Sequence, residues 1–261
     1  MMVKSVSMLL SCSLLGALVT GCGRAKPPSS AAAKTQVSES RPGAPTFTPS
    51  PMPTPANDTR PLIVAFGDSL TAGYGTGAGE SYPDYLQRDL NARGYGYRVV
   101  NEGISGNTSK DGVVRVQRIA AMHPAVVIVA FGGNDGLRGI PISDTDTNLA
   151  TIISTLQNAH AKVILGGITL PPNYGSEYIA KFNAMYEKQA HAHHVPLLPF
   201  MLKNAYGVSG DMQNDGIHAT AKGNQQVARN FLPLLLPLLH QSHLHLPLKA
   251  NTPVDANPTQ P

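Results

Sequence analysis

Apolar residues between positions 61 and 235 follow two alternating patterns. Short, almost wholly apolar runs are typical of buried strands, and longer segments with apolar residues every three or four positions are typical of helices. The runs lie at residues 61–67, 97–103, 125–133, 162–168 and 195–200. The helical pattern covers residues 82–94, 108–123 and 144–160, a segment around Ile179–Tyr186, and a last segment with Val227, Phe231 and Leu235. The alternation predicts an α/β domain with a parallel sheet covered by helices on both faces.

The beginning of the chain has a different pattern. Residues 1–21 start with a lone basic residue and continue into an apolar run of about 13 residues, which is shorter than the roughly 20 that a membrane span needs. This pattern indicates a secretory signal. Its end, LVTGC, resembles the lipobox of bacterial lipoproteins, in which the cysteine becomes the acylated first residue of the mature chain. Cys22 is therefore the expected lipidation site, and the alternative is that this cysteine is incidental.

Two further segments do not look globular. Residues 22–61 are dominated by Pro, Ser, Thr and Ala, and residues 240–261 are similarly tail-like. Such segments bury too little apolar surface to offset the entropy lost on ordering. We therefore expect an extended tether after Cys22, a disordered C-terminal tail, and one folded domain at residues 62–239, which is a sufficient length for a single core.

The composition excludes several kinds of site. The two cysteines, Cys12 and Cys22, would be lost to cleavage and used by acylation, so the mature domain has no disulfide and no thiolate metal site. The HAHH cluster and the histidines near the C-terminus have no carboxylate or cysteine at ligand spacing, and neither a metal nor a cofactor is expected. The net charge of +4 comes from scattered basic residues, so we expect no nucleic-acid partner.

Three polar or small residues directly follow the first three predicted strands. They are Ser69 in GDSL, Gly106 in EGISGNTS, and Asn134 in FGGNDG. In open parallel sheets, ligands bind beyond the carboxyl ends of the strands. These three residues therefore lie where the predicted fold would place a site.

A serine hydroxyl is a weak nucleophile unless a base removes its proton. Among the histidines, His218 has the most unusual setting, in NDGIHATAKG, with Asp215 three residues before it. In a loop or first helical turn, this spacing lets the carboxylate reach Nδ1 and leaves Nε2 facing a serine. The alternative is a helix-capping Asp215 beside a surface histidine.

An acyl-transfer site also needs donors for the oxyanion that develops during attack. The Ser69 N–H, the Gly106 N–H and the Asn134 side-chain amide are the candidates. Gly106 and Asn134 also have simpler interpretations. Gly106 could be present only because the backbone has a positive φ there, and Asn134 could only cap a turn.

Taken together, GDSL with Ser69, the glycine at 106, GGND with Asn134 and DGIH with Asp215 and His218 resemble the SGNH (GDSL) hydrolase family. SGNTSKDG, GGNDGLRG, LPPNYG and VPLLPF are most similar to the bacterial acyl-CoA thioesterase, arylesterase and lysophospholipase subgroup. The resemblance implies a three-layer α/β/α fold of about five strands. It also implies Ser69 as nucleophile, His218 as general base, Asp215 as its orienting residue, and an oxyanion hole of Ser69, Gly106 and Asn134.

The same resemblance suggests which loops meet the substrate. The loops GNDGLRGI and ITLPPNYG would rim the site, with Leu137, Leu170 and Pro171 as apolar contacts to the acyl chain. The alternative is that these are ordinary connecting loops. Asp135 is expected to be structural. One departure from the family is Ala219 after the histidine, which should affect the local turn more than the chemistry.

We therefore expect a monomeric, lipid-anchored serine hydrolase of the cell envelope that cleaves esters, thioesters or lysophospholipids. Gly23 after the lipidated cysteine lacks the aspartate associated with inner-membrane retention, which favours the outer membrane. Two alternatives stay open from the sequence. One is an O-acetyl esterase of envelope polysaccharide, which would use the same triad. The other is an inactive envelope-binding lipoprotein.

Overall fold

The structure is a computed structural model that describes residues 58–240. The expected signal peptide, Cys22, most of the expected tether and the tail from residue 241 lie outside the described residues. Five parallel strands form one sheet in the order β2-β1-β3-β4-β5. They are β1 (Leu62–Gly67), β2 (Arg98–Gly103), β3 (Val126–Ala130), β4 (Lys162–Gly166) and β5 (Leu197–Leu198).

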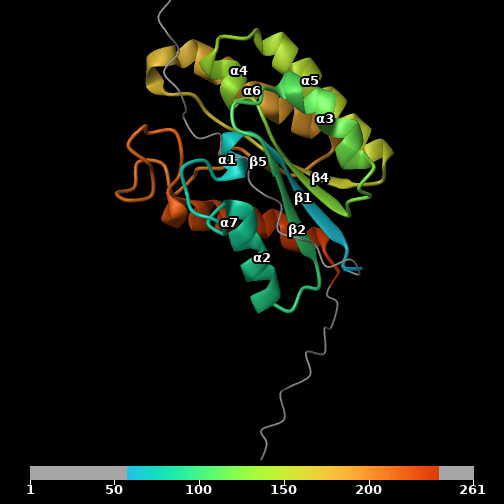
Figure 1. Cartoon of the computed structure of the whole chain (residues 1–261). Helices are drawn as coiled ribbons and strands as arrows, with labels where there is room; N and C mark the ends of the chain where they lie inside the picture. Colours follow the sequence, from blue (N-terminus) through green and yellow to red (C-terminus); the bar gives the residue numbers. More distant parts are fainter. Residues whose placement is uncertain (1–57, 241–261) are drawn as a thin grey trace, which may run out of the picture. The chain divides into compact units, whose positions relative to one another are not determined.

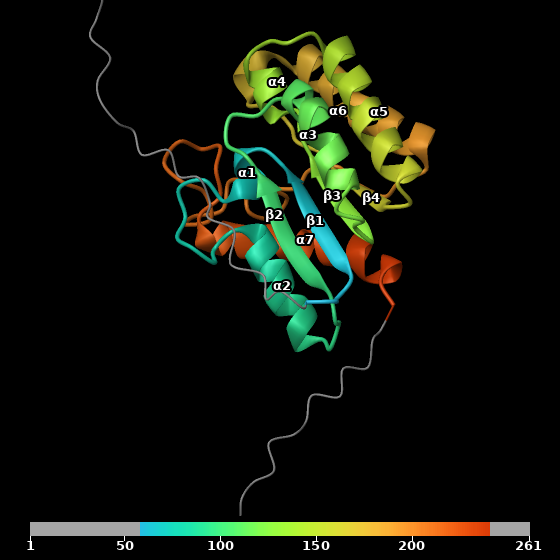
Figure 2. The ribbon, with the colours of Figure 1, turned by 45° about the vertical axis from the view of Figure 1, so that its right-hand side comes forward.

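Helices cover both faces of this sheet (Figure 1). One face carries α3 (Ser109–Ala120), α5 (Ile142–Asn158) and α6 (Ser176–His193), and the other carries α2 (Tyr82–Ala92) and α7 (Ala221–Leu235). Figure 2 shows the two helical layers from a second direction, on either side of the strands. The short helices α1 (Ser69–Ala72), α4 (Gly133–Leu137), η1 (Pro172–Tyr174) and η2 (Leu236–Leu238) complete the set. The expected α/β/α sandwich is confirmed.

The core follows the apolar patterns of the sequence. Every residue of β1 and β3 is buried, as expected for central strands that helices cover on both sides. On α5, the residues of the predicted inward stripe have no exposed surface: Leu149, Ile152, Ile153 and Leu156. On α3, Val116 and Ile119 face the core while Val114 is 77% exposed, which is the division that a helical period requires.

β3 and β5 show the largest shortening relative to their apolar runs. β3 ends at Ala130 because Gly132, with φ of +117°, leads into α4. A side chain at this glycine would place a Cβ 2.2 Å from the Tyr186 hydroxyl oxygen. β5 has two residues, and Pro196 and Pro199 flank them. Proline has no N–H to donate to a ladder, so pairing ends there.

Within residues 58–240, none of the helices combines the length and the apolar character that crossing a membrane requires.

Candidate active site

Ser69 is the first residue of α1, directly beyond the carboxyl end of β1. The turn is close-packed, because a Cβ on Gly67 would lie 2.2 Å from the Thr71 Oγ1 and 2.6 Å from the Ala130 carbonyl oxygen. Asp68 caps the short helix, and its Oδ1 accepts the Leu70 N–H at 3.0 Å. The sequence Gly-Asp-Ser therefore turns the chain sharply and leaves the serine at the edge of the sheet.

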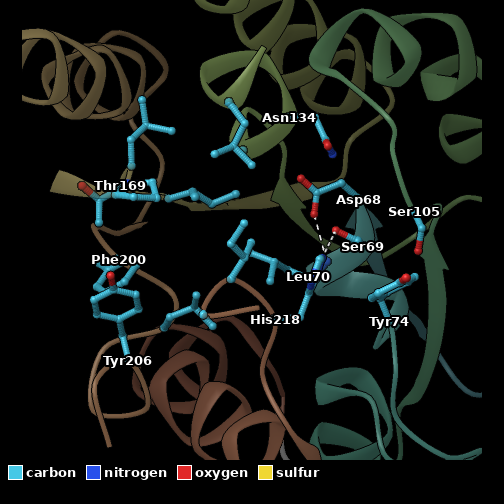
Figure 3. A pocket seen from close by; sticks show the side chains of 18 of the residues that line it. Asp68, Ser69, Leu70, Tyr74, Ser105, Asn134, Thr169, Phe200, Tyr206 and His218 are labelled. Atoms are coloured by element: carbon cyan, nitrogen blue, oxygen red, sulfur yellow. Dashed lines mark hydrogen bonds between the residues drawn. The ribbon is translucent and has the colours of Figure 1, made fainter. Parts of the chain in front are cut away.

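His218 lies between Ser69 and Asp215 in a chain of hydrogen bonds. Its Nε2 is 2.9 Å from the Ser69 Oγ, and its Nδ1 is 2.7 Å from the Asp215 Oδ2. Figure 3 shows the contact between the serine and the imidazole. This is the geometry in which an imidazole can accept a serine proton while a carboxylate holds its other nitrogen.

Asp215 is held mainly by the loop that it shares with His218. Its Oδ1 accepts the N–H groups of Ile217 at 2.9 Å and His218 at 3.0 Å. Partial burial on its own raises the pKa of this carboxyl, but the hydrogen bonds from the His218 backbone, the His218 ring and Ile217 outweigh it, so the pKa lies below its ordinary value. The carboxylate is thus ionised opposite the imidazole.

The loop itself is closed at its base. Met212 and Ala219 form an isolated antiparallel bridge, and the Gln213 N–H donates to the His218 carbonyl at 2.8 Å. The Gln213 side chain also donates to the Tyr74 carbonyl at 2.6 Å, and the Tyr74 ring lies 4.7 Å from the His218 ring. The imidazole is therefore positioned both by its own loop and by the loop that follows α1.

Ser69, Gly106 and Asn134, which carry the three expected oxyanion donors, line the same cavity. In the described part of the chain, neither the Ser69 N–H nor the Gly106 N–H donates to a protein acceptor. The Asn134 Nδ2 donates one hydrogen to the Asn107 carbonyl at 2.9 Å, which leaves its second hydrogen available. Two free backbone amides and one side-chain amide can bind an oxyanion.

The site opens into a cavity of ≈ 360 Å³. Leu137, Leu170 and Pro171, which the sequence suggested as substrate contacts, all line it. Ser69, Asn134, Gly106 and His218 line it as well. In Figure 3, Thr169, Phe200 and Tyr206 lie on one side of the Ser69–His218 pair, and Ser105 and Tyr74 lie on the other. A cavity of this size is within the range of small-molecule binding sites.

Sequence reasoning missed part of this wall. The segment between β5 and the loop of Asp215 and His218 contributes apolar side chains. Residues that flank the recognised motifs do so as well, and together the missed residues are Leu70, Tyr74, Ile168, Phe200, Leu202, Tyr206 and Ile217. The segment from 201 to 210 has no helical or strand period, so no pattern in the sequence marked it. The aromatic and aliphatic residues of this segment were the feature of the sequence that could have indicated a role in the cavity wall.

Asp135 is fully buried and accepts hydrogen bonds from the Ser109 N–H at 2.9 Å, the Ser109 hydroxyl at 2.5 Å and the Thr145 hydroxyl at 3.2 Å. These bonds join α4 to α3 and α5, which fits the structural role expected of Asp135.

Asp68, by contrast, is a buried carboxyl with no cation beside it in the described residues. It is 2% exposed and borders the cavity. Burial raises its pKa to about 7; the hydrogen bond from the Leu70 N–H opposes this rise, and the nearby Asp135 adds to it. Neither the sequence pattern nor the family resemblance pointed to this property.

The raised pKa of Asp68 makes a prediction about stability. Between the ordinary value of 3.8 and about 7, the folded state holds a proton that the unfolded state has lost. The contribution of Asp68 to the free energy of unfolding is therefore fully present below the unfolded-state pKa of 3.8. It is lost as pH rises through the folded-state pKa of about 7, by up to about 1.4 kcal/mol per pH unit. Asp68→Asn keeps the acceptor for Leu70 and cannot ionise.

Thermal melts at pH 5 and pH 7.5 test this prediction. Relative to the Asp68→Asn variant, the wild-type Tm should drop by about 5 °C more over this interval. The other carboxyls contribute equally to the Tm shift of both proteins, so the comparison cancels their contribution. Some of them have lowered pKa values and would change the stability in the opposite direction. Parallel Tm shifts would contradict the assignment.

No group of three or more His, Cys, Asp or Glu side chains in residues 58–240 is arranged to hold a metal ion.

The fold and the site together define a hydrolase with a serine at the carboxyl edge of a parallel α/β/α sheet. Residues 65–226 match the GDSL-like Lipase/Acylhydrolase family, and the chain belongs to this family. It is accordingly a hydrolase that acts on ester bonds, as the sequence predicted.

Two relatives show which part of the family it is similar to. The chain is 41% identical to esterase TesA of Pseudomonas aeruginosa over 178 residues, which cover 68% of this chain and 89% of that protein. It is 37% identical to thioesterase 1/protease 1/lysophospholipase L1 of Escherichia coli K12 over 179 residues, 68% of this chain and 85% of that one. The solved structure of TesA superposes with a TM-score of 0.66, at 41% identity, over 68% of this chain and 99% of that chain.

Proposed function

We propose that this chain is a lipid-anchored serine esterase that cleaves acyl esters, thioesters or lysophospholipids through an acyl-enzyme. The observation that carries this proposal is the hydrogen-bonded series Ser69–His218–Asp215 at the edge of a largely apolar cavity. The names of the two relatives, an esterase and a thioesterase/lysophospholipase, support the same class of substrate.

In the proposed reaction, the Ser69 Oγ attacks the acyl carbonyl carbon while the His218 Nε2 takes the serine proton. The carbonyl oxygen becomes an oxyanion that the Ser69 and Gly106 N–H groups and the Asn134 amide stabilise. His218 then gives its proton to the departing alcohol or thiol, and the acyl group stays on Ser69. A water that His218 deprotonates releases the carboxylic acid and restores the serine.

The lining of the cavity favours an acyl chain over a sugar. The side chains along it are mostly aliphatic or aromatic, among them Leu137, Leu170 and Phe200. A site for acetylated polysaccharide would need several hydrogen-bonding groups to hold hydroxyls. The O-acetyl esterase alternative is therefore the weaker one.

The proposed anchor at Cys22 bears on the natural substrate. It rests on the sequence LVTGC and on the tether that follows it. An exported lipoprotein does not meet the acyl-CoA of the cytoplasm, so lysophospholipids and other envelope esters are the proposed substrates. Metabolic labelling with an alkynyl palmitate tests the anchor: the label should appear on the wild-type chain and be lost in Cys22→Ala.

A substrate comparison tests the proposed class. One preparation of the purified enzyme should turn over p-nitrophenyl butyrate, lysophosphatidylcholine, palmitoyl-CoA and acetylated xylan at very different rates. We expect measurable kcat/KM on the first two and the lowest value on xylan. A preference for xylan would overturn the acyl-chain proposal, and a preference for palmitoyl-CoA would overturn the argument from location.

A further inference from the structure

Arg138 follows α4 at its carboxyl end, four residues after Asn134. Its Nη2 donates to the Gly106 carbonyl at 2.9 Å, across 32 residues of sequence. The Asn134 side chain donates to the next carbonyl, that of Asn107, also at 2.9 Å. Residues four apart on a helix lie on the same face. A side chain of α4 and the side chain at its C-cap therefore bond to two consecutive carbonyls of the same turn.

This turn has little else to fix its tip. The Asn107 N–H donates to the Ile104 carbonyl at 3.1 Å, which closes a four-residue turn. Its third residue, Gly106, has φ of +83°, the conformation for which type II turns use glycine. Ile104 is 42% exposed, and Ser105 and Gly106 are exposed as well. The Ile104 N–H donates to the Gly67 carbonyl at 3.1 Å, which ties the start of the turn to β1. Beyond that point, the bonds from Asn134 and Arg138 restrain the exposed end of the turn.

A carboxylate, that of Asp111, lies in the neighbourhood of Arg138 without forming an ion pair with it in the described residues. Asp111, in the first turn of α3, accepts the Thr108 N–H at 2.8 Å and the Thr108 hydroxyl at 2.7 Å. These two bonds are the main causes that lower the pKa of Asp111, and the positive charge of Arg138 adds to them. In the described residues, the hydrogen bond to the Gly106 carbonyl is the contact that holds the exposed Arg138 guanidinium.

We propose that Arg138 is a positioning residue for the oxyanion hole, which holds the Gly106 turn so that the Gly106 N–H faces the developing oxyanion. This inference rests on the proposed role of Gly106 in that hole. A donor that moves freely stabilises the transition state less than one held in place, because part of its orientation must be regained at each turnover. Loss of Arg138 should therefore lower kcat and leave substrate binding nearly unchanged.

Kinetics of two variants test the inference. Arg138→Gln removes the charge and shortens the side chain. The kcat for p-nitrophenyl butyrate should fall about tenfold, which corresponds to the loss of one hydrogen bond from a charged donor. The KM should change less than about twofold. Arg138→Lys keeps a charged donor and should recover part of the loss. The matched control is Arg88→Gln, because Arg88 also donates to the carbonyl of an exposed glycine, Gly79, at 2.8 Å and does not line the cavity. The control should keep the wild-type kcat.

A second readout separates positioning from a loss of structure. n-Butylboronic acid binds a reactive serine by forming a bond from the Ser69 Oγ to boron, the serine proton passing to His218, and the tetrahedral adduct is anionic like the transition state. Its Kd should rise about tenfold in Arg138→Gln, in step with kcat. The Kd for butyrate, a product, and the Tm should stay at the wild-type values.

Three results would overturn the inference: a kcat for Arg138→Gln within twofold of wild type, an equal loss of affinity for the boronic acid and for butyrate, or an equal loss of kcat in the Arg88 control. Asn134→Ala, made in parallel, should lose about a hundred- to a thousandfold in kcat. If that variant is impaired and Arg138→Gln is not, the inference alone fails. If Asn134→Ala and Ser69→Ala both keep the wild-type kcat, the proposed function fails.

Discussion

Ser69→Ala should reduce the kcat for p-nitrophenyl butyrate by about a millionfold, the loss seen when the nucleophile of a serine hydrolase is removed. The Ser69 hydroxyl makes one side-chain contact in the described residues, with the His218 Nε2. Removing it therefore breaks that one hydrogen bond and leaves the Gly67 turn and the Asp68 cap intact. The variant should be folded, with a Tm within about 2 °C of wild type, and should not react with a fluorophosphonate.

The matched control is Ser154→Ala. Ser154 lies on α5, where its hydroxyl bonds to backbone carbonyls of the same helix, and it does not line the cavity. This control should retain wild-type turnover and labelling. A folded Ser69→Ala protein that still hydrolyses the ester at the wild-type rate would exclude Ser69 as the nucleophile.

Asp215→Asn should reduce kcat by about ten thousandfold, although the change replaces a single oxygen by NH₂. The reason lies in how the two oxygens of Asp215 are used. The Oδ1 accepts two backbone N–H groups, from Ile217 and His218, and an amide NH₂ cannot take that place. The NH₂ of the substituted side chain must therefore face the His218 Nδ1. The imidazole then carries its hydrogen on Nε2, where it points at Ser69 and leaves no base for the serine proton.

Asp144→Asn, which changes an exposed carboxylate in the first turn of α5, is the control for this experiment and should be fully active. The Tm of both variants should agree with that of the wild type. In each variant the side-chain carbonyl oxygen still accepts the hydrogen bonds that a carboxylate oxygen accepted before. If Asp215→Asn retained more than a tenth of the wild-type kcat, the tautomer of His218 would not depend on Asp215.

The fold was largely predictable because its central strands carry unbroken apolar runs. All residues of β1 and β3 are buried. Both faces of these strands must therefore be covered, and the helical patterns in the sequence supply the covering elements. The same logic placed Ser69, Gly106 and Asn134 at one sheet edge, since parallel strands end together. Their assembly with His218, which lies 149 positions further along the chain than Ser69, came from the family resemblance rather than from any periodicity.

Other features depend on tertiary contacts that no local pattern records. The burial of Asp68 follows from the helices packed around it, and a carboxylate in a turn is ordinarily exposed. Phe200 and Tyr206 lie in an irregular segment whose path is set by the residues that it meets. The contact of Arg138 with Gly106 joins two loops, and a single basic residue after a motif does not predict it. The length of β5 depended on two flanking prolines within a run that otherwise reads as a strand.

The bridge between Met212 and Ala219 has a consequence for how this enzyme can diverge. It closes the loop of Asp215 and His218 at its base, so the acid and the base form a small module with its own boundary. The segment that supplies Phe200, Leu202 and Tyr206 to the cavity ends just before that boundary. Substitutions in that segment change the cavity wall without touching the contact between the Asp215 carboxylate and the His218 imidazole. Changes to the cavity wall before residue 212 therefore leave the backbone bridge around Asp215 and His218 in place.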